Sequence, residues 1–224
     1  MSYNPQTGPT SEARAVLPRG RHAASRQVVW ESQRERLLAA MADAVAEKGY
    51  ARVAVADVIE RAGVSRKTFY EQFANKEECF LAAYDVGVEL LMEGIDEAIQ
   101  AAAPDWIGAA QAGTTAYLEM LEANPSLART FLVEVLAAGP PALARRAEVH
   151  ARFARQLADA HAAARRDLPA LPDLQPYVFR ACVGAINELV TDRLTAAGAE
   201  GLAELQPAVL DIQVKLLLGG VIVT

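Results

Sequence analysis

The chain has 224 residues, of which 52% are hydrophobic and 22% are charged. This balance supplies apolar material for a buried core and excludes a protein that is disordered over most of its length. Charge is unevenly divided: residues 1–76 carry 12 Lys and Arg against 8 Asp and Glu, whereas residues 77–224 carry 10 against 20. A basic N-terminal part on an acidic remainder indicates that the former meets a polyanion, with a chance partition of charge as the alternative.

Other broad classes are excluded by what the sequence lacks. Cys79 and Cys182 lie far apart and outside any Cys-x-x-Cys pattern, so we expect neither a disulfide framework nor a zinc site. No apolar stretch reaches the roughly 18–20 residues of a membrane helix, and residues 1–20 lack the apolar core of a secretory signal. We therefore expect a cytoplasmic protein that meets no membrane and carries neither a metal nor a cofactor.

Residues 1–30 are predicted to form a flexible basic arm, because they contain three prolines, two glycines and no sustained apolar period. Four arginines oppose the single acid Glu12, namely Arg14, Arg19, Arg21 and Arg26. Such an arm either follows phosphates or a minor groove, as homeodomain arms do, or only keeps the protein soluble. The sequence leaves both interpretations open.

The first predicted helix covers residues 32–48. Ser32 and Glu35 form a capping box, in which two side chains satisfy free backbone N–H groups at a helix start. Apolar residues then recur at helical spacing, and Gly49 ends the run.

Two shorter helices, predicted over 55–62 and 66–72, form a helix-turn-helix candidate. Gly63 should end the first of them in the left-handed conformation that a helix C-terminus often needs. Ser65 is placed to cap the second. Two short helices joined by such a tight turn are typical of a helix-turn-helix.

The remainder of the chain is predicted to be helical. Asn75, with Glu78 at the matching third position, should cap a long helix that runs to about Ala102. Breaks rich in Pro and Gly separate further helical segments over 105–123, 126–138, 142–166, 174–197 and 201–218. The fold class is therefore all-α with about nine helices, divided into the arm (1–30), a three-helix head with the helix-turn-helix (31–76) and a helical regulatory and dimerisation body (77–224).

The segment 66–73 divides into an inward and an outward face. Phe69 and Phe73 lie four positions apart, so they share the face that packs against the head. The remaining side chains are free to meet base edges and phosphates in a major groove. They are Arg66, Lys67, Tyr70, Glu71 and Gln72.

Over residues 31–80 the sequence resembles the DNA-binding head of TetR-type regulators. The matching residues are Gly49-Tyr50, Asp57-Val58-Ile59, Ala62-Gly63-Val64-Ser65, Thr68-Phe69-Tyr70, Phe73 and Asn75-Lys76-Glu77. The body resembles the family only in its length and its helix pattern.

The resemblance implies a double-stranded DNA operator as partner and assigns roles around the third helix. It implies phosphate contacts for Thr68, Tyr70 and Lys76, with a core aromatic as the alternative for Tyr70 and a solvated lysine as the alternative for Lys76. An Arg can fork onto guanine, Gln can bridge adenine and Glu can accept from cytosine. The whole DNA-binding set is Ser65, Arg66, Lys67, Thr68, Tyr70, Glu71, Gln72 and Lys76.

Two positions depart from the family pattern. Ala54 stands where Ser or Thr often caps the second helix, and Ala56 stands where Arg is often found. We therefore expect the head to depend more on the basic arm, so that deleting residues 1–28 should weaken DNA binding markedly.

The resemblance further implies a homodimer that pairs through its last two helices, since one head contacts too little DNA for tight specific binding. Small residues at Gly184 and Ala185 would permit close approach of two copies. For about half of these positions an intrachain core is the alternative. The predicted interface comprises Cys182, Ala185, Leu189, Val209, Ile212 and Leu216.

A small-molecule effector enclosed by the middle helices is also implied, with its occupancy changing the spacing of the two heads. The low polarity of the large side chains there favours an apolar or aromatic ligand. Each of these side chains can instead be an ordinary core residue. The candidates are Trp106, Tyr117, Met120, Phe131, His150, Phe153, Tyr177 and Phe179.

Two other classes of function compete with a repressor released from a palindromic operator. An enzyme is disfavoured, because the sequence has no phosphate-binding loop, nucleophile elbow or His-Glu-x-x-His motif. His150 and His161 are eleven positions apart, or roughly 16 Å along a helix, too far to share a metal. A helical scaffold that does not bind DNA is the stronger rival.

Overall fold

The computed structural model describes residues 20–102 and 106–218, with side chains from residue 29 onward. This part of the chain contains nine α-helices, three short 3-10 helices and no strand, which confirms the all-α prediction. The elements are α1 (Gly20–Lys48), η1 (Tyr50–Arg52), α2 (Val55–Ala62), α3 (Arg66–Gln72), α4 (Lys76–Ala101), α5 (Trp106–Ala123), α6 (Pro125–Leu132), η2 (Glu134–Ala137), α7 (Pro140–Asp167), α8 (Pro176–Ala197), η3 (Leu202–Leu205) and α9 (Gln206–Leu217).

The predicted start of the first helix is wrong. Helix α1 begins at Gly20, so residues 20–30 of the predicted arm are helical, and Ser32 and Glu35 lie inside the helix. The physical reason is that residues 21–31 contain neither Gly nor Pro, and nothing stops a helix from propagating through them. Residues 1–19 of the predicted arm lie outside the described residues.

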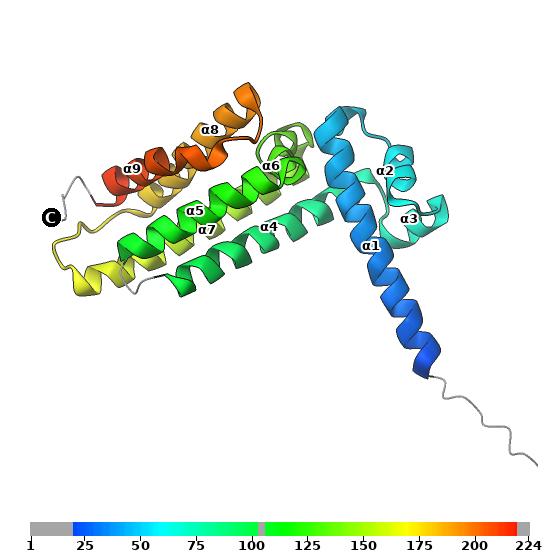
Figure 1. Cartoon of the computed structure of the whole chain (residues 1–224), viewed down its shortest axis with the longest axis horizontal. Helices are drawn as coiled ribbons and strands as arrows, with labels where there is room; N and C mark the ends of the chain where they lie inside the picture. The colour runs from blue at the N-terminus through cyan, green and yellow to red at the C-terminus, as the bar shows by residue number, and fades with distance from the viewer. Residues whose placement is uncertain (1–19, 103–105, 219–224) are drawn as a thin grey trace, which may run out of the picture.

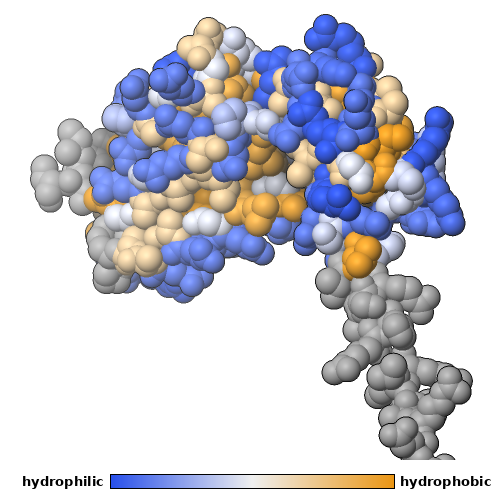
Figure 2. Space-filling model, turned by 45° about the vertical axis from the view of Figure 1, so that its right-hand side comes forward, coloured by the Kyte–Doolittle hydropathy of each residue, from blue (hydrophilic) through white to orange (hydrophobic). Residues whose placement is uncertain are grey.

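The head lies at one end of the molecule and the body at the other (Figure 1). Helices α1, α2 and α3 form the head, and α4 runs out of it along the length of the body. Helices α5 and α7 lie alongside α4, while α8 and α9 follow one outer edge of the body. In Figure 2 hydrophilic residues cover much of the surface, with apolar patches between them.

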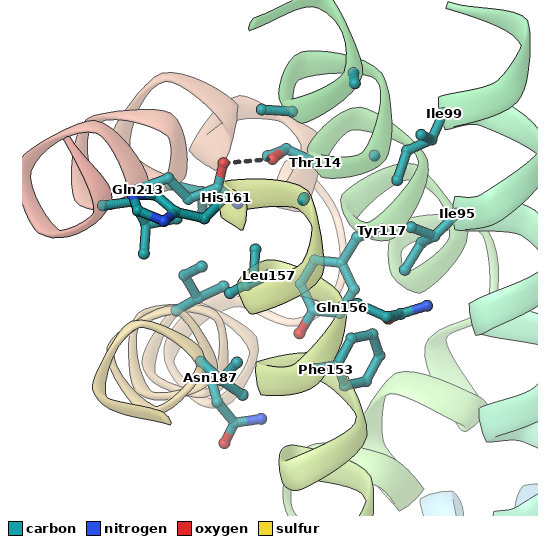
Figure 3. A pocket seen from close by; sticks show the side chains of 18 of the residues that line it. Ile95, Ile99, Thr114, Tyr117, Phe153, Gln156, Leu157, His161, Asn187 and Gln213 are labelled. Carbon is teal, nitrogen blue, oxygen red and sulfur yellow. Dashed lines mark hydrogen bonds between the residues drawn. The ribbon is translucent and has the colours of Figure 1, made fainter. Parts of the chain in front are cut away.

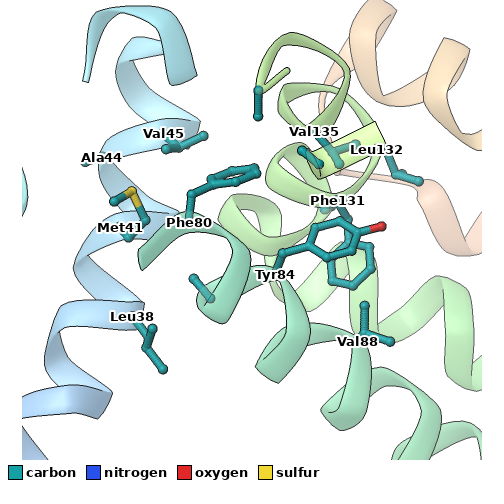
Figure 4. Packing of buried hydrophobic residues seen from close by; sticks show 14 of the residues in the cluster. Leu38, Met41, Ala44, Val45, Phe80, Tyr84, Val88, Phe131, Leu132 and Val135 are labelled. Carbon is teal, nitrogen blue, oxygen red and sulfur yellow. The ribbon is translucent and has the colours of Figure 1, made fainter. Parts of the chain in front are cut away.

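One continuous apolar core joins the head to the body. Phe80 on α4 projects between Val45 of α1 and Val135 of η2 (Figure 4), and its ring lies edge-on to that of Tyr50. Tyr84, one turn further along α4, stacks on Phe131 of α6 with ring centroids 4.5 Å apart. Because close-packed cores are weakly compressible and transmit strain, we expect a shift of α6 or α4 to be felt in the head.

Two further properties concern only the described residues. None of their helices combines the length and apolar character needed to cross a membrane. Among the same residues no three His, Cys, Asp or Glu side chains cluster as metal ligands would.

Candidate functional site

The helix-turn-helix forms from the local signals that predicted it. Helix α2 ends at Ala62, and Gly63 takes the left-handed conformation with φ 62° and ψ 40°. Ser65 then caps α3, since its hydroxyl accepts a hydrogen bond from the backbone N–H of Thr68 at 3.0 Å. Both predicted helices have the expected bounds, because each terminus is fixed by residues within a few positions of it.

Helix α3 has a buried face that fixes its position on the head. Phe69 is 0% exposed and Phe73 is 2% exposed, which confirms their predicted inward direction. Their ring centroids lie 5.8 Å apart, and the guanidinium of Arg34 on α1 lies 4.5 Å from the centroid of Phe73. The opposite face of α3 is therefore held outward by packing.

Four of the predicted DNA-binding side chains lie together on that outward face. Arg66, Lys67, Tyr70 and Glu71 are all exposed. The Arg66 guanidinium lies 5.7 Å from the centre of the Tyr70 ring, and Lys67 pairs with Glu71 at 3.7 Å. An exposed pair of this kind contributes little to stability, so these groups remain available to a partner.

Gln72 and Lys76 do not join this exposed group. Gln72 is only 8% exposed, and its side-chain amide donates to the backbone carbonyl of Trp30 on α1 at 3.1 Å. The ammonium of Lys76 donates to the carbonyls of Tyr50 and Val53, both at 2.9 Å. In this conformation Gln72 ties α3 to α1, which corrects its predicted outward direction, while Lys76 ties the start of α4 to the η1 turn.

The missing cap at Ala54 is compensated from the other side of the helix start. The Asp57 carboxylate accepts a hydrogen bond from the backbone N–H of Ala54 at 2.8 Å. It also pairs with Lys48 at 2.7 Å, and these hydrogen bonds lower the pKa of Asp57. Helix α2 thus keeps the half of a capping box that satisfies the Ala54 N–H, and lacks the half that a hydroxyl at position 54 would supply.

A second site lies inside the body as an elongated cavity of about 440 Å³ (Figure 3). On α4 the wall runs from Tyr84 to Ile99, and on α7 it runs from Val149 to Ala164. Each stretch covers about 22 Å at the helical rise per residue. Helices α5, α6, α8 and α9 complete the wall. The size falls in the range of small-molecule sites.

Five of the eight predicted lining residues lie on this cavity, namely Trp106, Tyr117, Phe131, His150 and Phe153. The other three predictions are wrong. Tyr177 is 71% exposed in the first turn of α8, Phe179 packs edge-on to His161 in a separate cluster, and Met120 contacts Gly94.

Sequence reasoning also missed the apolar face of α4 and the polar residues of the wall. Leu91 and Ile95 face the cavity from α4, whose periodicity indicates burial without saying against what. The hydroxyl of Thr114 lies 3.5 Å from the Gln213 side-chain oxygen, a long contact between α5 and α9. The ring of His161 is 7% exposed and forms part of the same wall.

Both histidines of the wall are held neutral. Burial, with Arg146 and Arg180 nearby, lowers the pKa of His150 from 6.5 to about 4. Burial likewise lowers the pKa of His161 below its usual value. At neutral pH neither imidazole adds a positive charge to the cavity.

The lowered pKa of His150 predicts that acid destabilises the protein. Between about pH 6.5 and pH 4 the unfolded chain binds a proton at this residue that the folded protein does not, so the free energy of unfolding should fall as the pH falls. After allowance for partial exposure we expect a loss of about 1–2 kcal/mol. Urea unfolding at pH 7 and pH 5 measures it. In His150→Gln the pH dependence should be shallower, and an unchanged profile would contradict the assignment.

A polar contact links the cavity to the head. Glu134 of η2 is 7% exposed and accepts a hydrogen bond from the backbone N–H of Tyr50 at 2.8 Å. The same carboxylate pairs with Arg129 at 3.3 Å. Phe131 and Leu132, the last two residues of α6, line the cavity and lie within three residues of Glu134. The wall of the cavity and the turn that leads into the helix-turn-helix are therefore only a few residues apart.

The predicted dimer residues on α8 and α9 do not share one exposed face. Cys182 is 0% exposed and Val209 is 1% exposed, so both are core residues and their predicted interface role is wrong. The side chains that point outward from these helices include Tyr177, Glu188 and Val214. The other predicted residues are half-buried, namely Ala185, Leu189, Ile212 and Leu216.

Comparison with known proteins identifies the head. Residues 37–83 match the model of the family described as bacterial regulatory proteins, tetR family. The transcriptional regulator EthR of Mycolicibacterium smegmatis is 30% identical over 121 residues, which are 54% of each chain. The transcriptional activator FasR of the same organism is 28% identical over 83 residues, 37% of this chain and 38% of FasR. The matches thus span about half or less of these relatives.

Solved structures share the fold over nearly their whole length. FadR from Bacillus halodurans, a fatty acid degradation regulator, gives a TM-score of 0.74 at 20% identity, covering 85% of this chain and 96% of that one. FadR from Bacillus subtilis, solved in complex with stearoyl-CoA, gives 0.72 at 18% identity, covering 83% and 98%. The matched residues 37–83 and the all-α fold shared with these structures make this chain similar to the tetR family of bacterial regulatory proteins.

Proposed function

We propose that this protein is a transcriptional regulator that binds DNA as a homodimer and loses affinity for it when a small molecule fills its cavity. The observation that carries the DNA-binding part is the outward face of α3, where Arg66, Lys67 and Tyr70 stand exposed on a helix anchored by Phe69. A helix held in this way can enter a major groove. Such a protein acts where the chromosome lies, in the cytoplasm.

The exposed groups suit both kinds of DNA contact. The Arg66 guanidinium can fork onto guanine, and the Glu71 carboxylate can accept from cytosine. The Tyr70 hydroxyl and the Thr68 hydroxyl can reach phosphates. Lys76 has a third N–H beyond the two that its carbonyl partners take, so a phosphate contact requires no break in the head.

Two heads are needed for tight and specific binding, because a single recognition helix reads too few base pairs. The outer faces of α8 and α9 support pairing: Val214 is 40% exposed, and nothing lies within 4 Å of a Cβ built at Gly184. A small residue on an open face allows close approach of a second copy. We infer that these faces, rather than the buried Cys182 and Val209, make the contact.

The ligand is inferred to be elongated and largely apolar. The cavity follows α4 and α7 for about 22 Å by the helical rise, and most of its wall is aliphatic or aromatic. The similar protein from Bacillus subtilis was solved with stearoyl-CoA, which has a long acyl chain. We propose that binding of the ligand relieves repression.

The contact between Glu134 and Tyr50 is the proposed route from the cavity to the head. A ligand that displaces Phe131 or Leu132 moves η2, and with it the carboxylate that holds the Tyr50 N–H. The Tyr50 carbonyl in turn holds Lys76 at the start of α4. Such a ligand changes DNA affinity only by the difference in its affinity for the two head positions.

Binding to the DNA upstream of the protein's own gene, followed by fluorescence anisotropy over a salt series, tests the DNA-binding role. We expect affinity to fall steeply as salt rises, because phosphate contacts release counterions. Arg66→Ala should cost about 1–3 kcal/mol of binding free energy, and Tyr70→Phe less. Arg155→Ala removes an exposed arginine from the body and serves as the matched control, with no expected change.

The rival scaffold function makes the opposite prediction. A folded protein that binds no DNA at physiological salt, or whose binding is unaffected by Arg66→Ala and Tyr70→Phe, would contradict the proposed role of α3. Deletion of residues 1–19, which leaves the whole of α1 in place, tests the separate expectation that the basic arm adds affinity.

A further inference from the structure

We propose that the cavity takes an uncharged elongated molecule and discriminates against anions, above all against polyanionic thioesters such as acyl-CoA. The inference rests on the proposed ligand-sensing role and adds the charge of the ligand to it. The positions and the negative sign of the charged residues in the cavity wall support this inference.

The exposed residues of the wall indicate that the mouth of the cavity lies between α4 and α7. Of the lining residues, those that are exposed at the surface are Asp96 and Ile99 on α4 and Asp159 and Ala160 on α7. Gln156 of α7 donates to Asp96 at 3.2 Å across this opening. A ligand whose head group remains outside the cavity must therefore place that group beside the two carboxylates.

Among the described lining residues, Asp96 and Asp159 are the charged ones at neutral pH, and no Lys or Arg lines the cavity. Glu93 and Glu97, exposed on the same helix as Asp96, add further negative charge. Arg152 is engaged by Glu89 through two hydrogen bonds of 2.5 and 2.9 Å. Arg155 is exposed one turn before Asp159 and does not line the cavity. The phosphates of a coenzyme A would meet net repulsion here.

None of the described Lys or Arg residues lines the interior, although Arg146 and Arg180 lie behind the wall near His150. His150 and His161 are neutral at pH 7, and Thr114, Tyr117 and Gln213 offer only uncharged polar groups. Arg146 stands behind the wall, where it donates to the Asn187 side chain at 2.7 Å. A buried carboxylate without a direct cationic partner is costly, whereas a hydroxyl or amide finds partners among these groups.

Three probes have the same chain length and differ in the charge of the head group: 1-dodecanol, dodecanoate and dodecanoyl-CoA. Trp106 lines the cavity and reports binding by its fluorescence, in a Trp30→Phe background that removes the other tryptophan. We expect dodecanol to bind at least about tenfold more tightly than dodecanoyl-CoA at low salt, equivalent to about 1.4 kcal/mol. This difference in affinity should become smaller as the salt concentration rises, because ions screen the carboxylates at the mouth.

The paired substitution Asp96→Asn with Asp159→Asn tests the cause. It should raise the affinity for dodecanoyl-CoA relative to dodecanol by about fivefold or more, since two repulsive charges are removed. Glu119→Gln with Glu200→Gln removes the same net charge from exposed positions outside the cavity and should leave that ratio unchanged.

Each outcome decides the matter. Tightest binding by dodecanol, with a ratio that responds only to the mouth variants, supports the inference. An anionic probe that binds as tightly as dodecanol, or mouth variants that behave like the control pair, overturns the inference and leaves the sensing role standing. Binding of none of the three probes overturns both the inference and ligand sensing, while DNA binding is judged separately by anisotropy.

Discussion

Replacing Phe69 with alanine is expected to destabilise the head by about 3–5 kcal/mol and to abolish DNA binding. The side chain is 0% exposed and packs against Phe73 and Tyr70, with ring centroids 5.8 and 5.3 Å away. Its loss leaves a cavity beneath the helix that carries Arg66 and Lys67. Urea unfolding gives the free-energy change, and amide hydrogen exchange shows whether it is confined to the head.

Tyr70→Ala on the neighbouring position is the matched control. Tyr70 is 47% exposed, so its removal should change the free energy of unfolding by no more than about 1 kcal/mol while lowering DNA affinity. Equal destabilisation by the two substitutions would show that α3 does not have the buried and exposed faces described above.

Replacing Glu134 with alanine is expected to cut the link between cavity and head. The Tyr50 N–H loses its acceptor, which should cost about 1–3 kcal/mol of stability. The ratio of DNA affinities with and without the tightest dodecyl probe should fall towards one, from a coupling of about 5–150-fold. Anisotropy with and without the probe measures this ratio.

Glu134→Gln separates the hydrogen bond from the charge. The amide oxygen can still accept from Tyr50, but the pair with the half-exposed Arg129 is lost. We expect this variant to keep most of the coupling. Full coupling in Glu134→Ala, with the ligand still bound, would place the route between the two sites elsewhere.

The helix-turn-helix was predictable because its geometry is local. Gly63 and Ser65 fix the ends of α2 and α3 through residues no more than four positions away. The predicted start of α1 was wrong because it too rested on local signals. A capping pattern at Ser32 and Glu35 does not mark a helix start when the preceding residues can themselves be helical.

Side-chain directions that depend on distant partners could not be read from the sequence. Gln72 follows Phe69 by three positions and so borders the buried face, but its partner is a carbonyl 42 positions earlier in the chain, which periodicity does not reveal. Lys76 is tied to carbonyls 26 and 23 positions earlier. These contacts depend on how α1, η1 and α4 are arranged, which periodicity does not specify.

The residues of the cavity could likewise be predicted only in part from the sequence. Aromatic size pointed correctly to Tyr117 and Phe153, whose rings meet edge-on, but also to Tyr177, which points to solvent. The charge of the mouth depends on Asp96 and Asp159, which lie on helices far apart in the sequence. Composition alone gives only an acidic body, not acidic residues at an opening.

Selection from a random-sequence DNA library tests the central claim most directly, because it requires no knowledge of the natural operator. The purified protein and its Tyr70→Ala variant are each carried through repeated rounds of binding, and the recovered duplexes are sequenced. We predict that the wild-type protein enriches a two-fold symmetric sequence with half-sites spaced for two heads, and that the variant enriches none. Failure of the folded wild-type protein to enrich any sequence would contradict the assignment of this chain as a sequence-specific DNA-binding regulator.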